Sequence, residues 1–140
     1  MIWTDLSSAP PPATVVAQAA EVAGAIALTI TTAAGEFPLL LVRVDDGVKG
    51  YVNMCPHRFL PLDYRSPRLL SQDGLRLMCS SHGAMFDAAT GHGVAGEGLG
   101  CALIPVPLVE DAGAIRIAPQ INAHQSALTN RVGPSARDPI

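Results

Sequence analysis

The sequence is poor in cysteine, in aromatic residues and in charge, and each shortage excludes a class of protein. Its 140 residues include three Cys, one Trp, two Tyr and three Phe, and 15% of them are charged. Three cysteines are too few for a disulfide-rich scaffold and are typical of a reducing compartment. A formal net charge of -3 leaves no excess of basic residues of the kind that binds nucleic acid.

The sequence also lacks a long hydrophobic run. Its most apolar stretch, residues 22–30, is much shorter than the roughly 20 residues that a transmembrane helix needs. The N-terminus has no basic region, and the prolines at positions 10–12 interrupt it before an apolar segment can form, which argues against a secretory signal. We therefore expect a cytoplasmic protein that does not associate with a membrane.

Glycine and proline are frequent, with 13 Gly and 12 Pro, and this composition suits short strands joined by turns. Ile26, Leu28 and Ile30 alternate with small or polar residues, as in a half-buried strand. Thr14 could cap a short helix over residues 15–23. Further strand-like runs cover residues 39–44, 50–53, 75–78, 85–87, 92–94, 101–108 and 114–117.

A chain of this length suits one hydrophobic core. We predict an all-β domain at residues 22–118. A Pro- and Ala-rich N-terminal extension, residues 1–21, precedes it, and a C-terminal extension without hydrophobic periodicity, residues 119–140, follows it.

Two short runs each combine a thiol with an imidazole: Cys55-Pro56-His57 and Cys79-Ser80-Ser81-His82. Such ligands suit soft or borderline metals, and two loops can close around one ion or one small cluster. Structural zinc sites usually pair like ligands within a loop, whereas each loop here supplies one Cys and one His. This arrangement favours two irons, one bound by both thiolates and the other by both imidazoles. A zinc ion that stabilises the fold is the alternative.

These runs resemble the signature of the Rieske [2Fe-2S] family, Cys-x-His followed by Cys-x-x-His. The likeness continues through Arg58 and residues 61–62 after the first run, and through residues 83–87 with Thr90-Gly91 after the second. It implies an antiparallel β-sandwich of the Rieske type with a small cluster-binding subdomain of two loops. It also implies the ligands of a [2Fe-2S] cluster: Cys55 and Cys79 on the inner iron, His57 and His82 on the outer one.

The residues around these ligands bear on the reduction potential. Rieske proteins of high potential carry an additional cysteine in each loop, and a Ser and a Tyr that donate hydrogen bonds to sulfur. The matching positions here hold Leu60, Ser81, Ala84 and Phe86. Without those donors the reduced, more negative cluster is less stabilised, so we predict a potential toward the end of the Rieske range at about -150 mV.

Within this family, the chain resembles ferredoxin components of ring-hydroxylating dioxygenases and related bacterial Rieske proteins. The resemblance implies a one-electron carrier rather than an enzyme, with a flavin-dependent ferredoxin reductase and a terminal oxygenase as partners. No dinucleotide-binding or mononuclear-iron motif is apparent in the sequence. The alternative is a small non-catalytic subunit of a larger redox enzyme such as nitrite reductase.

Two features lie outside the ligand set. Cys101 could form a disulfide only at the expense of a ligand, and we interpret it as a small buried apolar residue. A concentration of basic residues before and between the motifs predicts a positive face that attracts an acidic redox partner, although ordinary solvated side chains explain it equally well. These residues are Arg43, Lys49, Arg58, Arg65, Arg68 and Arg76.

Overall fold

The computed structural model describes residues 2–45, 47–56, 60–64, 68–79, 84–96 and 99–119. Short strands and two single 3-10 turns make up their regular structure. In chain order these are η1 (Trp3–Asp5), β1 (Val15–Gln18), η2 (Ala19–Glu21), β2 (Ala25–Thr32), β3 (Gly35–Val44), β4 (Gly47–Val52), β5 (Arg76–Met78), β6 (Met85–Asp87), β7 (Gly93–Ala95), β8 (Pro105–Val106), β9 (Leu108–Asp111) and β10 (Ala114–Ile117).

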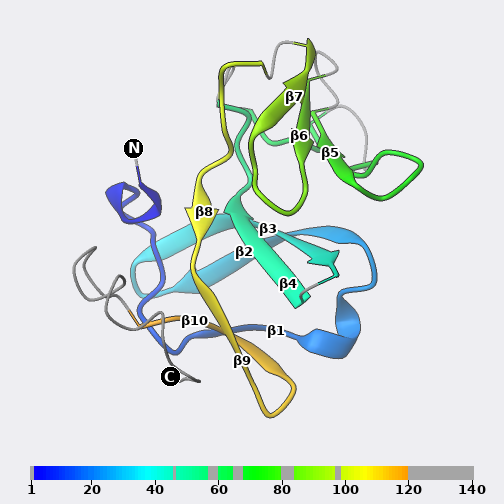
Figure 1. Ribbon diagram of the computed structural model, residues 1–140. Coiled ribbons are helices and arrows are strands. Elements are labelled where there is room, and N and C mark those ends of the chain that lie inside the picture. Colours follow the sequence, from blue (N-terminus) through cyan, green and yellow to red (C-terminus); the bar gives the residue numbers. More distant parts are fainter. Residues whose placement is uncertain are drawn as a thin grey trace, which may run out of the picture.

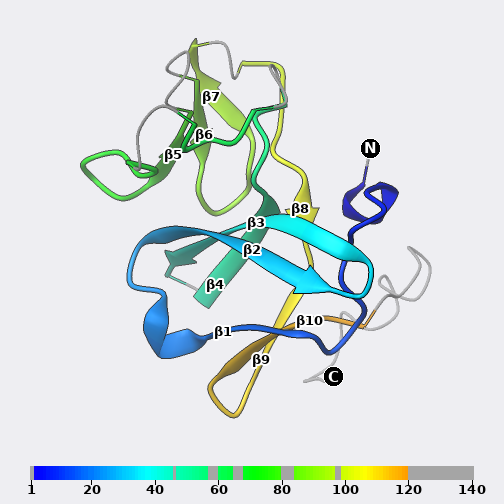
Figure 2. The same ribbon diagram turned by 180° about the vertical axis from the view of Figure 1, so that it is seen from behind.

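The strands form three antiparallel sheets, in the orders β1-β10-β9, β2-β3-β4-β8 and β5-β6-β7. The first two make up the sandwich, and the third stands above them as a small subdomain in both views (Figures 1 and 2). The predicted all-β architecture of the Rieske type, an antiparallel sandwich with a small subdomain, is confirmed.

The sheet β2-β3-β4-β8 is the middle layer, and β3 shows why. All four side chains from Leu39 to Val42 are fully buried. Because successive side chains of a strand point to opposite faces, Leu39 and Leu41 enter one core while Leu40 and Val42 enter another. We call the first the sandwich core and the second the upper core, because it lies between the middle sheet and the β5-β6-β7 subdomain.

The N-terminal residues belong to the sandwich core. Trp3 is buried and meets Phe37 edge to face, with the ring centroids 6.1 Å apart. The predicted helix over residues 15–23 is wrong, because β1 pairs with β10 there and only the single turn η2 follows. Thr14 Oγ1 donates a hydrogen bond to the Pro11 carbonyl instead of capping a helix. The folded unit thus includes residues before position 22.

The strand predicted over residues 101–108 is also incorrect. The structure divides this segment into the isolated bridge at Ala102, the two-residue strand β8 and the start of β9. Pro105 and Pro107 have no N–H to donate to a sheet, so a continuous strand is disfavoured here. The hairpin partner of β10 is therefore β9, and its turn uses the positive φ angles of Ala112 (53°) and Gly113 (85°). Positions 120–140, most of the predicted C-terminal extension, lie outside the described residues.

Candidate metal centre

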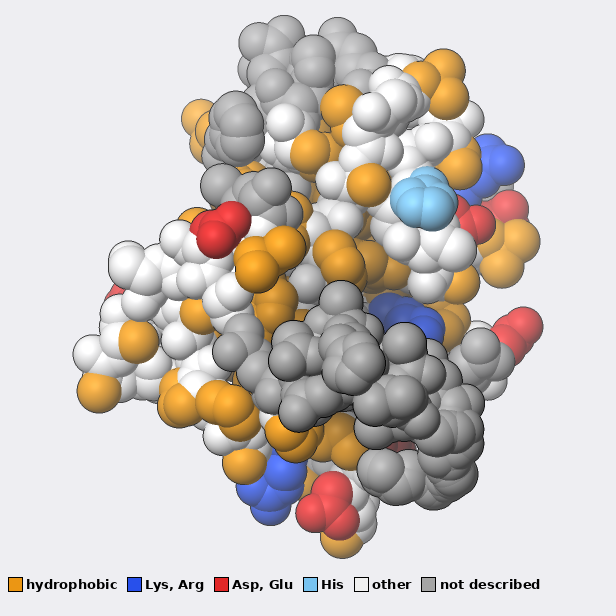
Figure 3. All heavy atoms as spheres, turned by 60° about the vertical axis from the view of Figure 1, so that its left-hand side comes forward, with side chains coloured by type: hydrophobic (Ala, Val, Ile, Leu, Met, Phe, Trp, Pro, Cys, Tyr) orange, Lys and Arg blue, Asp and Glu red, His pale blue; other side chains and the backbone are white. Residues whose placement is uncertain are grey.

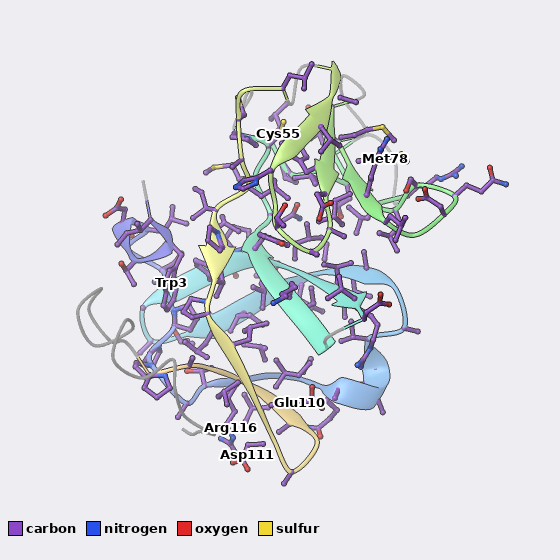
Figure 4. All side chains as sticks on the ribbon, in the orientation of Figure 1. Trp3, Cys55, Met78, Glu110, Asp111 and Arg116 are labelled. Carbon is purple, nitrogen blue, oxygen red and sulfur yellow. The ribbon has the colours of Figure 1, made fainter. Side chains whose placement is uncertain are left out.

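Two of the four predicted ligands come together in the upper core. Cys55 follows β4 and Cys79 follows β5, and each is only 1% exposed. Figure 4 shows Cys55 in the upper part of the molecule, beside the strands of the subdomain. His57 and His82 lie outside the described residues, and no group of three metal-binding side chains occurs within the described ranges.

Each buried thiol begins a loop, and the two loops are closed in the same way. The Cys55 N–H donates to the Leu60 carbonyl at 2.7 Å, and the Cys79 N–H donates to the Ala84 carbonyl at 2.8 Å. We call residues 55–60 the first loop and residues 79–84 the second loop. Each bond joins a cysteine to the residue five positions later, so both thiols occupy equivalent places at the base of their loops.

The two loops differ in the structure of the chain segments next to these closing hydrogen bonds. Below the second loop the chain continues as a strand pair, in which Met78 faces Met85 and Leu77 faces Phe86. Below the first loop the side chain of Asn53 takes this place, because its Oδ1 accepts a hydrogen bond from the Leu62 N–H at 2.9 Å. Among the described residues, the second loop is closed by backbone hydrogen bonds and the first by a side chain as well.

The surroundings of the thiols are apolar. At two positions where high-potential relatives carry hydrogen-bond donors, Ala84 and Phe86 are buried at 1% and 0% exposure in the same core. Of the two positions that match the additional cysteines, Leu60 is half-buried and Ser81 lies outside the described residues. Neither a methyl group nor a phenyl ring donates a hydrogen bond to sulfur.

Among the buried residues described in the upper core, Tyr51 carries the only hydroxyl group. This hydroxyl donates to the Ala88 carbonyl at 2.8 Å, so it is already engaged. Burial, together with the nearby carboxylate of Asp87, raises the pKa of Tyr51 to about 12. The ring also contacts the β6–β7 turn at Gly91, where an added Cβ would lie 2.7 Å from Tyr51 Cε1. Tyr51 thereby connects the middle sheet to the subdomain.

The described basic residues of the predicted positive face are separated from one another on the face in Figure 3. Arg43 donates to the carbonyls of Ala19 at 2.6 Å and Val22 at 2.9 Å. Arg76 lies opposite Asp87 in the β5–β6 pair. In Figure 3 the Lys and Arg side chains on the visible face lie apart from one another, and some are beside Asp or Glu. The described residues on this face thus form no continuous basic surface, and positions 58 and 65 lie outside the described part of the chain.

Cys101 differs from the two buried cysteines. It is half-buried rather than buried as expected, and it is not among the members of the upper core. Its carbonyl accepts a hydrogen bond from the Gly93 N–H at 2.9 Å, which ties the segment after β7 to that strand. The structure gives its thiol no part in the site.

The sequence did not indicate the roles of Asn53 and Tyr51. The available signal at Asn53 was a polar residue at the end of a strand, two positions before Cys55; its burial is a finding of the structure. Tyr51 gave no such signal, because its partner Ala88 lies 37 residues away in the sequence.

The chain was compared with known proteins. Residues 13–110 match the family model of the Rieske [2Fe-2S] domain. No curated protein matches the chain. A similar structure is the ferredoxin of carbazole 1,9a-dioxygenase from Nocardioides aromaticivorans IC177, with a TM-score of 0.60 and 22% identity over 79% of this chain and 100% of that one.

Two further similar structures extend the comparison. A ferredoxin from Sphingomonas yanoikuyae B1 has a TM-score of 0.60 and 24% identity, over 77% of this chain and 99% of that one. Dicamba monooxygenase bound to dicamba has a TM-score of 0.58 and 31% identity, over 79% of this chain but 32% of that one. A Rieske-type [2Fe-2S] cluster is the cofactor that goes with the matched family. No helix in the described ranges has the length and hydropathy of a membrane span.

Proposed function

Since the chain belongs to the Rieske [2Fe-2S] domain family, we propose that it is a low-potential, ferredoxin-like carrier of single electrons. Cys55, His57, Cys79 and His82 hold its cluster, with the thiolates on the inner iron and the imidazoles on the outer one. The cluster, when bound, supplies reversible one-electron chemistry. The residues of the chain hold it, exclude water from the thiolates and set the potential.

One observation supports this proposal above all. Cys55 and Cys79 begin two loops closed by equivalent hydrogen bonds, and both thiols are buried in one apolar core. Two thiols that are 24 positions apart in the sequence need a reason to be buried together. A centre ligated by one thiol from each loop supplies that reason, and the Cys-x-His and Cys-x-x-His spacing provides an imidazole beside each of them.

The low potential follows from the buried neighbours of the thiols. Hydrogen bonds to cluster or ligand sulfur stabilise the reduced state, and burial in apolar surroundings opposes its additional negative charge. Ala84 and Phe86 donate no hydrogen bond, and the Tyr51 hydroxyl is engaged by the Ala88 carbonyl. These features favour a potential near the lower limit of the Rieske range, about -150 mV.

The redox partners are inferred from the similar structures. One is the ferredoxin of a carbazole 1,9a-dioxygenase, and another is a complex of reduced oxygenase and oxidised ferredoxin in carbazole 1,9a-dioxygenase. By analogy, this chain receives an electron from a flavin-dependent reductase in the cytoplasm and delivers it to a terminal oxygenase of the ring-hydroxylating type. It carries no catalytic residues of its own in this scheme.

The proposal is tested on the purified full-length chain. Iron and acid-labile sulfide should be present in equal amounts, about two of each per chain. The oxidised protein should then be reduced by NADH in the presence of a purified flavin-dependent ferredoxin reductase, and reoxidised by an oxygenase. A colourless protein that contains zinc and no sulfide would contradict the proposal and support the zinc alternative.

A second candidate is a Rieske component that stays bound to a larger enzyme. The observation in its favour is that dicamba monooxygenase, which this chain matches over about a third of its length, is more identical to it than either ferredoxin. Size-exclusion chromatography of the natively expressed protein separates the two candidates. A free monomer that still exchanges electrons supports the carrier, and stable co-purification with an oxygenase or reductase subunit supports the bound component.

A further inference from the structure

Asn53 is the only amide or charged side chain that is buried among the described residues, at 7% exposure. It lies between the end of β4 and Cys55. Both polar groups of its side chain are used: Oδ1 accepts from the Leu62 N–H at 2.9 Å, and Nδ2 donates to Asp63 Oδ1 at 3.1 Å. Its backbone N–H donates to the Pro38 carbonyl at 3.0 Å, which anchors it to β3.

The Asn53 side chain takes the place of a strand pair below the first loop. In the second loop, the bond from Cys79 to Ala84 is followed by the β5–β6 strand pair. In the first loop, the bond from Cys55 to Leu60 is followed by no strand pair among residues 60–64. The Asn53 side chain reaches across to Leu62 instead. It therefore replaces the next backbone hydrogen bond below the loop, with an amide side chain in place of a peptide group. We call this link from Asn53 to Leu62 the rung.

Asp63 determines which way this amide points. An Asn side chain has an acceptor oxygen and a donor nitrogen of nearly equal shape, and either can face a neighbour. An ionised carboxylate accepts hydrogen bonds only, so Asp63 binds the nitrogen and leaves the oxygen for the Leu62 N–H. Leu62 itself is fully buried in the upper core beside Cys55 and Cys79, which fixes the far end of the rung.

We propose that Asn53 is a positioning residue of the cluster-binding site, whose amide, oriented by Asp63, holds the first loop closed and fixes Cys55 relative to Cys79. The inference rests on the proposed function and extends it to a residue outside the ligand set. It predicts that loss of the rung loosens the first loop specifically, so that a bound cluster is released faster while the second loop is unaffected.

Three variants of the full-length chain test this. Asn53→Leu removes both hydrogen bonds and keeps the branching and the number of heavy atoms of the side chain. Asn53→Asp keeps the acceptor for Leu62 but sets two carboxylates against each other. The double variant Asn53→Asp/Asp63→Asn restores a donor and acceptor pair in the opposite direction, at unchanged total charge. Tyr51→Phe is the control, because it removes a different buried side-chain hydrogen bond, the one from the Tyr51 hydroxyl to the Ala88 carbonyl in the upper core.

The readouts are the rate of iron loss to a chelator, followed by visible absorbance, and hydrogen exchange at the amides of Leu62, Cys55 and Cys79. Asn53→Leu should release iron about tenfold faster or more. Asn53→Asp should be intermediate, and the double variant should return to within about twofold of wild type. Faster exchange should appear at Leu62 and Cys55 but not at Cys79, and Tyr51→Phe should change neither Leu62 exchange nor iron release.

The inference is overturned if Asn53→Leu releases iron at the wild-type rate, or if the double variant is no better than Asn53→Asp. It is also overturned if Tyr51→Phe has the same effect as Asn53→Leu, because the effect would then be a general loss of stability. If Asn53→Leu does not fold, Asn53→Asp and the double variant decide. If wild type binds no iron, the proposed function fails, and amide exchange in the metal-free chain still tests the rung.

Discussion

The sandwich core and the upper core are built from different parts of the chain. The sandwich core draws on strands from both ends of the described fold, from Trp3 to Ile117, and its buried members are all hydrophobic. The upper core draws on residues 40–103 and takes several members from loops, among them Cys55, Leu62 and Cys79. One core is therefore closed by β-sheet hydrogen bonds, and the other depends on loops being held in place.

This difference assigns a separate task to each core. A core formed by paired strands is stable through burial and backbone hydrogen bonding without a ligand. A core formed by loops gains much of its order from what binds there, because metal binding and folding are coupled. The sandwich core should thus maintain the fold whether or not the cluster is present, while the upper core should be completed by the cluster. The charged residues Glu110, Asp111 and Arg116 lie at the opposite end of the molecule from Cys55 (Figure 4).

Removal of a ligand should have the largest effect and separate the two cores. Cys55→Ser, Cys79→Ser, His57→Ala and His82→Ala should each abolish the cluster or greatly shift its potential, whereas the β-sheet signal in circular dichroism should remain because the sandwich core is untouched. Iron content and the visible spectrum measure the loss. Cys101→Ala is the control and should leave the spectrum intact; if it abolished the spectrum, the ligand assignment would be wrong.

Truncation of Phe37 should destabilise the sandwich core. This ring is fully buried and packs against Trp3, so Phe37→Ala should lower the free energy of unfolding by about 3–5 kcal/mol, in the metal-free and the loaded protein alike. Urea unfolding measures it. Val109→Ala, at a residue 42% exposed on β9, is the control and should cost less than about 0.5 kcal/mol. Equal effects of the two variants would contradict the assignment of Phe37 to a core.

The contact between Tyr51 and Gly91 joins the two parts. Gly91 has a φ of 80°, and an added Cβ would lie 2.7 Å from Tyr51 Cε1, so Gly91→Ala should cost about 2–4 kcal/mol. Gly74→Ala is the matched control, because its φ is 76° but nothing lies within 4 Å of the added Cβ. It should cost only about 1 kcal/mol, the backbone part. Thermal unfolding of both variants gives the difference, and equal losses would exclude the steric contact.

Hydrogen-bond donors placed next to the thiols should make the upper core more polar and so change the reduction potential. Ala84→Ser and Phe86→Tyr should each raise the reduction potential, by about 60 mV for a hydrogen bond worth about 1.4 kcal/mol. Protein-film voltammetry of the two variants and wild type measures the shift. An unchanged potential in both variants would remove hydrogen bonding from the explanation of the low potential.

The smallest effect is expected for Tyr51→Phe, which loses one hydrogen bond and about 1 kcal/mol at neutral pH. The folded state holds the phenol proton more tightly, because its pKa is raised from 10.0 to about 12. The resulting contribution to the free energy of unfolding is complete below pH 10 and is lost as the pH rises from 10 toward 12. Urea unfolding at pH 9 to 12 should show the loss in wild type and not in the variant. A parallel decline in both proteins would contradict the role of Tyr51.

Local patterns predicted the parts of the fold in which partner strands are neighbours in the sequence. The alternation at Ile26, Leu28 and Ile30 and the apolar run of β3 predicted the β2–β3 hairpin. The pairing of Val15 with Arg116 could not be predicted, because the partner lies at the other end of the domain and tertiary packing overrides local preference. For the same reason an apparent helix at residues 15–23 is a strand and a turn.

The candidate site was predictable to the extent that its chemistry resides in residue types. The spacing of Cys55 and Cys79 predicted that the two thiols would meet, and the upper core contains both. The ligand roles of Cys55, His57, Cys79 and His82 stay predictions. Asn53 and Tyr51 were missed because their roles depend on where a hydrogen-bonding group points, which a sequence does not show.

A redox titration followed by electron paramagnetic resonance tests the central claim most directly, because it reports the type of cluster and its potential together. The account predicts that the oxidised protein gives no signal. One-electron reduction should produce the signal of a cluster ligated by two histidines, with a midpoint potential of about -150 mV. A signal typical of an all-cysteine cluster, a midpoint well above about 100 mV, or no signal at all would contradict it.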